Sequence, residues 1–108
     1  MAFNEQLAYR IREQLKFYSE DFDEKRMFGG LAFLYQGKMT VGIIKQDLFV
    51  RVLGEKMEEV LINDFARPMD FTKRVMKESV YISKDGYRTE EQLLQWIELG
   101  LEHVKSKL

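Results

Sequence analysis

The chain has 108 residues, which is enough for one domain over 1–108 and leaves no room for a second core. It contains no cysteine, which excludes disulfides, thiolate metal sites and a cysteine nucleophile. The formal net charge is −1, with acidic and basic residues interspersed, whereas general nucleic-acid binding calls for a strongly positive face. The composition therefore disfavours direct nucleic-acid binding.

The first residues give no sign of a targeting segment. They pass straight into a charged amphipathic pattern, without the basic and then apolar segments of a secretory leader. No apolar run approaches the roughly 20 residues that a membrane span requires. We expect a cytoplasmic protein without membrane contact.

The N-terminal segment predicts an amphipathic helix over 4–18. Apolar residues recur there every three or four positions, at Phe3, Leu7, Ile11, Leu15 and Tyr18. Asn4 is the predicted N-cap, because its side chain can accept a hydrogen bond from a free amide of the first turn. The stretch 19–26 is first acidic and then basic, and we interpret it as the connection into a sheet.

Three antiparallel strands are predicted next. From Leu31 the apolar period changes to two, and it persists over 31–35, 39–43 and 48–53. Gln36-Gly37 and the segment 45–47 supply the two reversals. Loops this short cannot carry a parallel crossover, so the strands form a meander. Apolar residues occupy both faces, and we expect part of each face to be covered.

A short helix and one or two further strands follow. The helix is predicted over 55–62, where apolar residues share one side. Pro68, the only proline, fixes an extended kink. Phe71 and the apolar run 80–82 indicate the strands, which end at a turn over 84–86.

A long terminal helix closes the predicted order. Thr89 and Gln92 form a capping box, in which each side chain can satisfy the other residue's free amide. The helix runs to about Lys107, with an apolar stripe of Leu93, Leu94, Ile97, Leu101, Val104 and Leu108. The order is therefore α-β(3)-α-β(1–2)-α, and helices packed on an antiparallel sheet give a two-layer α+β fold.

The run Arg26–Phe33 is followed by Gly37–Met39, and further on by Ala66–Phe71 and then 80–81. Taken together and at this spacing, these motifs resemble the TfoX N-terminal domain family. The resemblance extends from the first helix to 96–97. It implies a fold similar to that of the secretion chaperones, with an antiparallel sheet and the order α-β(3)-α-β(2)-α.

The resemblance also implies a class of function. Full-length bacterial competence regulators of this kind carry the domain together with a C-terminal helical domain, and act with a cyclic-AMP receptor protein at promoters. This chain looks like the stand-alone form. The family pattern has a Gly-Arg-Pro-Met-Lys-Gly run where this chain has Lys73–Glu78, so the resemblance assigns no role to that loop.

The Phe28-Gly29-Gly30 loop is the first candidate binding element. Its amides could surround an anion, although glycines there also serve to bend the chain into a strand. Arg51 and Arg67 could converge near this loop and hold a carboxylate or phosphate. In the alternative, these basic residues and Arg26 pair with local acids, as Arg67 would with Asp70.

No catalytic or metal site is predicted. His103 is the only histidine and lies off the apolar stripe, with no carboxylate three or four residues away, so we expect a solvated side chain. None of the serines lies in a nucleophile-elbow context, which argues against a Ser-His-Asp relay. We expect a non-catalytic protein without a metal or a cofactor.

The terminal helix carries the candidate interface. Trp96 lies on the shoulder of the stripe, Leu99 lies nearly opposite it, and Gly100 beside Leu99 leaves a surface for close approach. We expect this helix to help form a homodimer or a contact with an unknown protein partner. The favoured function is a non-catalytic regulatory or protein-interaction domain. The alternatives are small-ligand or anion binding between 28–30 and 67–70, and weak nucleic-acid binding through Lys73, Arg74 and Lys77.

Overall fold

The computed structural model describes residues 3–18, 21–27, 29–71 and 74–108, with the backbone alone for 69–71 and 74–76. Its elements are α1 (Glu5–Leu15), β1 (Phe22–Met27), β2 (Gly30–Tyr35), β3 (Lys38–Ile44), β4 (Asp47–Arg51), α2 (Gly54–Leu61), β5 (Ala66–Phe71), β6 (Arg74–Ile82), the 3-10 helix η1 (Lys84–Tyr87) and α3 (Glu90–Ser106). The strands form one antiparallel sheet in the order β1-β2-β3-β4-β6-β5. The predicted α+β class is confirmed.

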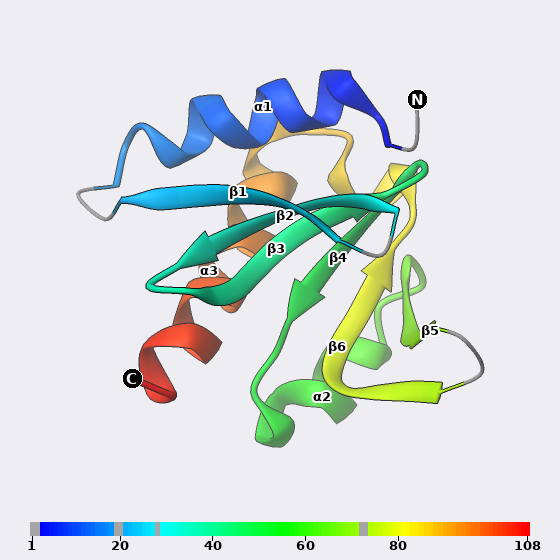
Figure 1. Ribbon diagram of the computed structural model, residues 1–108. Coiled ribbons are helices and arrows are strands. Elements are labelled where there is room, and N and C mark those ends of the chain that lie inside the picture. The colour runs from blue at the N-terminus through cyan, green and yellow to red at the C-terminus, as the bar shows by residue number, and fades with distance from the viewer. Residues whose placement is uncertain (1–2, 19–20, 28, 72–73) are drawn as a thin grey trace.

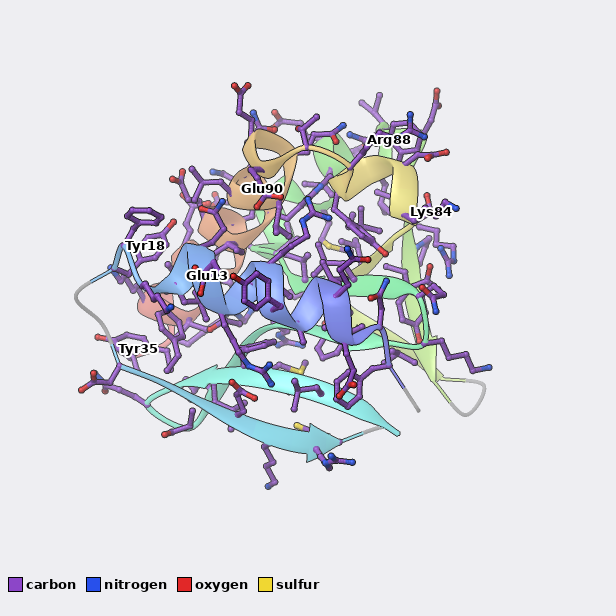
Figure 2. The ribbon with its side chains drawn as sticks, turned by 90° about the horizontal axis from the view of Figure 1, so that it is seen from above. Glu13, Tyr18, Tyr35, Lys84, Arg88 and Glu90 are labelled. Carbon is purple, nitrogen blue, oxygen red and sulfur yellow. The ribbon has the colours of Figure 1, made fainter. Side chains whose placement is uncertain are left out.

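The helices build the main core on one face of the sheet (Figure 1). Asn4 caps α1, since its Oδ1 accepts a hydrogen bond from the Leu7 amide at 3.0 Å. The Thr89–Gln92 capping box at the start of α3 is also confirmed. Arg10 joins the two helices, because its Nε lies 2.6 Å from an oxygen of Glu90, which is labelled in Figure 2.

The interpretation of 19–26 as a connection was wrong, because β1 occupies most of it. β1 is an edge strand that pairs only with β2, and its four central residues are exposed. With neither face buried, it shows no period-two apolar pattern. Its first residue, Phe22, contacts the rings of Tyr18 and Tyr35 at centroid distances of 6.4 and 5.8 Å, and these two tyrosines lie on the same side of the molecule in Figure 2.

Glycines serve the strands in two ways, at a tight turn and where two strands pack closely. Both Gln36 and Gly37 have positive φ, at 51° and 80°, which confirms the predicted hairpin turn between β2 and β3. Gly30 begins β2 against β3, where an added Cβ would lie 1.9 Å from the Ile43 carbonyl oxygen. Gly30 therefore serves the close packing of β2 on β3.

Two strands follow α2, as β5 and β6. Pro68 lies on β5, an edge strand, where a residue without an amide hydrogen is tolerated. Glu78 interrupts the regular backbone of β6, with φ at 58°. Its carbonyl oxygen accepts from the Val52 amide at 2.9 Å, so β6 stays joined to the chain just beyond β4.

The second face of the sheet carries a smaller core. Ala32, Phe49 and Tyr81 are buried there, and four half-buried side chains pack around them, those of Met27, Leu34, Met39 and Ile44. The Phe49 ring lies against Gly42, where an added Cβ would come within 2.1 Å of its Cζ. Each face is thus partly covered, as expected from the sequence.

Candidate functional site

Among the described residues, the three arginines of the predicted anion site lie apart and have separate contacts. Arg26 lies on β1 with its guanidinium carbon 5.8 Å from the Phe3 ring centroid, while Arg67 lies on β5, at the opposite edge of the sheet. Arg51 ends β4, and its Nη1 donates to the Ser79 hydroxyl at 2.8 Å. Phe28 and the side chain of Asp70 lie outside the described residues.

Arg67 pairs with Asp47, whereas the predicted pairing with Asp70 involves a side chain outside the described residues. Arg67 Nη2 donates to Asp47 Oδ2 at 2.5 Å, and its guanidinium carbon lies 4.8 Å from the Tyr81 ring centroid. Asp47 begins β4, whereas Arg51 ends it, so the acceptor of Arg67 and the residue Arg51 lie at opposite ends of this strand. The site proposed between 28–30 and 67–70 is not formed by neighbouring strands.

Two of the three interface candidates are buried. The Trp96 indole is 7% exposed, and its Nε1 donates to the Gly86 carbonyl at 2.8 Å. Gly100 packs on β3, where an added Cβ would lie 2.5 Å from the Thr40 carbonyl oxygen. Its close approach is therefore to the sheet and not to a partner. Leu99 is half-buried and remains accessible.

The expectation that His103 is solvated was wrong. The residue is 4% exposed, because α3 packs on β3 and β4 and covers this side of the helix. Its Nε2 lies 3.2 Å from Glu78 Oε1. Glu78 comes from β6, which is why no carboxylate was found for the histidine along α3.

Glu78 joins three elements and was not among the predicted residues. Its Oε2 accepts from the Gly54 amide at 2.9 Å, at the start of α2, where Leu53 provides no side-chain cap. Lys107 Nζ lies 3.7 Å from Oε1. The hydrogen bond with His103 is the main reason that the pKa of Glu78 is lowered, and the Gly54 amide adds to it.

A pH dependence follows from the burial of His103. Burial lowers the pKa of the imidazole because it disfavours the charged form, although the Glu78 carboxylate acts in the opposite direction. As the pH falls through about 6.5, the unfolded chain takes up a proton that the folded chain resists, so stability falls. The lowered pKa of Glu78 acts in the same direction at more acidic pH, where its contribution is lost.

We therefore expect the free energy of unfolding to decrease from about pH 7.5 to about pH 5.5, and to decrease less in His103→Gln. Glutamine keeps a donor for Glu78 but cannot be protonated. Because His103 is the only histidine, urea unfolding at the two pH values isolates its contribution. Equal decreases in wild type and variant would contradict this assignment.

An accessible groove lies between α2 and α3. Its volume is about 220 Å³, and it is lined by Lys56, Glu59, Val60, Asn63, Gln95, Trp96 and Leu99, which together we call the α2–α3 groove. The apolar side chains come from both helices. A shallower hollow that shares Lys56, Gln95 and Leu99 continues the groove along α3 to Glu98 and Glu102. Trp96 and Leu99 thus both reach this surface.

The rim of the α2–α3 groove is mostly acidic. Glu59 lines the groove from α2, Glu98 and Glu102 line its continuation along α3, and all three are exposed. Lys56 is the basic residue of the lining, and its Nζ lies 2.7 Å from Glu102 Oε1. This pair neutralises one acid and leaves an apolar floor inside a negatively charged rim.

Neither a metal site nor a spanning helix is found in the described part of the chain. No three His, Asp or Glu side chains there are placed to hold a metal ion. Over the same residues, every helix is too short or too polar to cross a bilayer.

Comparison with protein families identifies the family of the chain. The model of the TfoX N-terminal domain family matches residues 13–104, which run from the last turn of α1 through nearly all of α3. Comparison with curated proteins gives no match. The matched segment includes both walls of the α2–α3 groove. The chain therefore belongs to the TfoX N-terminal domain family.

Proposed function

We propose that the protein is a non-catalytic regulatory domain that acts by binding another protein at the α2–α3 groove. The observation that carries the proposal is the combination of an apolar floor at Val60, Trp96 and Leu99 with an acidic rim. Family membership supports the regulatory part, because the family is that of the N-terminal domain of competence regulators. We further propose that this regulation acts on transcription.

The charges indicate the chemistry of the partner. A positively charged segment would complement the rim, and a large apolar side chain on that segment would fill the floor. A second copy of this chain would bring two acidic rims together, which disfavours self-association through the groove. The same repulsion disfavours nucleic acid at this surface.

The contacts of the ionisable groups favour binding over catalysis. Glu78 is held by the first turn of α2 and by His103, so both groups already serve to join elements. A general base needs access to a substrate proton, and His103 is 4% exposed. A structural role suits this pair better than acid–base chemistry.

Leu99→Arg tests the proposed surface. The substitution places a cation where the basic partner would bind, and we expect capture of the partner from host lysate to fall about tenfold or more. Phe17→Arg is the matched control, because Phe17 is 86% exposed and lies just beyond α1. Quantitative mass spectrometry compares the proteins that immobilised wild type and each variant retain.

The expected result is a protein retained by wild type and by Phe17→Arg and lost by Leu99→Arg. Circular dichroism checks that both variants keep the fold. If every specifically retained protein is held equally by the two variants, the α2–α3 groove is not the binding surface.

A further inference from the structure

Arg51 is a half-buried cation without an ion pair. Its Nη1 makes both of its hydrogen bonds to uncharged acceptors, the Ser79 hydroxyl at 2.8 Å and the Lys77 carbonyl at 3.3 Å. In the described residues no carboxylate lies within ion-pair distance of it, whereas Arg10, Arg12, Arg67 and Arg88 all have such a partner. Buried charges are normally paired, whereas this half-buried guanidinium has only the electrostatic influence of Glu78, which lies beyond ion-pair distance.

A cavity of about 480 Å³ opens beside this guanidinium. It lies where β3 begins and β4 ends, next to the last turns of α3, and we call it the Arg51 pocket. Among the described residues, its lining consists of Lys38, Met39, Arg51, His103 and Lys107. The volume lies in the range of pockets that hold small molecules.

The Arg51 pocket is strongly positive. Three permanent cations line it, and none of the described lining residues is acidic. Lys38 is exposed and has no ion pair among the described residues, and Lys107 has only the long contact of 3.7 Å with Glu78. The Glu78 carboxylate lies close to His103 and Lys107 and offsets one of the three positive charges. The two positive charges that remain match an anion that carries two negative charges.

We propose that the Arg51 pocket binds a small molecule that carries a phosphate monoester. The free edge of the Arg51 guanidinium offers paired donors of the geometry that phosphate oxygens accept. Lys38 and Lys107 line the same cavity from the start of β3 and from the residue that follows α3, so a bound head group would meet donors from separate elements. Met39 provides an apolar wall for the remainder of the molecule.

A dianion suits this site better than a monocarboxylate. A single carboxylate would leave one of the cations unneutralised, and its two oxygens lie in one plane. A phosphate monoester presents three oxygens, which can be shared among donors from three directions. His103 lines the same cavity, so a bound dianion beside it would also favour its protonated form.

The test is a titration followed by nuclear magnetic resonance, at constant ionic strength because salt screens these charges. Inorganic phosphate and glycerol 3-phosphate are the probes, and acetate and a single-stranded oligonucleotide are the comparisons. We expect saturable shifts of the Arg51 side-chain Nε–H and the backbone amides around it, with glycerol 3-phosphate binding at about 10 mM or tighter. Acetate and the oligonucleotide should bind at least about tenfold more weakly.

Two variants locate the site. Arg51→Gln should abolish the saturable shifts of the surrounding amides, and Lys38→Gln/Lys107→Gln should weaken binding about tenfold without disturbing a half-buried group. Lys45→Gln/Lys84→Gln is the matched control, since both of these lysines are exposed and lie outside the pocket. The control should bind as wild type does.

Several results would overturn the proposal. Absence of saturable binding by both phosphate probes would remove the site. Equal weakening in the two double-lysine variants would show a general charge effect in place of a pocket. Acetate binding as tightly as glycerol 3-phosphate would contradict the dianion. Binding of the oligonucleotide without the monoester would assign the surface to nucleic acid.

Discussion

Phe49→Ala is expected to lower the free energy of unfolding by about 3–5 kcal/mol. Phe49 is fully buried on the face of the sheet that the helices do not cover. Its ring packs against Gly42, Ala32 and Tyr81, so truncation leaves a cavity that four strands line. Urea unfolding of wild type and variant at neutral pH measures the difference.

The control for Phe49 is Phe17→Ala, which removes the same ring from a site that is 86% exposed and should change stability by less than about 0.5 kcal/mol. A loss below about 1 kcal/mol at Phe49 would mean that the second face has no core of its own. That face would then be open to a partner, and the case for the α2–α3 groove would weaken.

Gly100→Ala is expected to destabilise the protein by about 2 kcal/mol, against the helix preference of alanine. Helix propensity alone would favour alanine by about 1 kcal/mol in α3. The added methyl group, however, would lie 2.5 Å from the Thr40 carbonyl oxygen and 2.9 Å from its Cγ2. Because the oxygen belongs to the backbone of β3, the helix itself must move away from the sheet.

Glu98→Ala provides the comparison on the same helix. Glu98 is exposed, so the substitution should be neutral or slightly stabilising. Thermal or urea unfolding of the two variants gives their difference. If Gly100→Ala proves as stable as Glu98→Ala, α3 does not pack closely on β3, and the burial of His103 would need another cause.

Apolar periodicity predicts those elements that bury one face. α1, β2, β3, β4 and the body of α3 were predicted in this way, because each turns one regular set of side chains into the main core. The prediction fails at β1, whose central residues 23–26 face solvent and carry charge. This strand is formed by backbone hydrogen bonding to β2, which does not require apolar side chains at every second position.

Local sequence patterns do not predict the contacts of the candidate site. His103 and Glu78 are 25 residues apart in sequence, and Arg67 and Asp47 are 20 apart, so both contacts depend on which strands become neighbours. A helical wheel also underestimates burial in α3. The wheel assumes one covered side, whereas η1 and β3 cover further sides and bury Trp96 and Gly100.

Some site residues could be predicted and others could not. Leu99 lies opposite the apolar stripe and is accessible, as the wheel indicated. Arg51 was predicted as a basic candidate. Its neighbours in the pocket could not be predicted, because Lys38 begins β3 and Lys107 follows α3, and these elements are far apart in sequence. No local signal marks Glu78, because its role comes from a backbone with positive φ and from two helices that meet it.

Site-specific photo-crosslinking tests most directly whether partners bind between α2 and α3. The chain has no cysteine, so Leu99→Cys or Leu34→Cys creates a single thiol for a benzophenone label, in the α2–α3 groove or on the second face of the sheet. After irradiation in host lysate, we predict a discrete adduct with another protein from Leu99→Cys and none from Leu34→Cys. An adduct from Leu34→Cys alone would contradict the proposed binding surface.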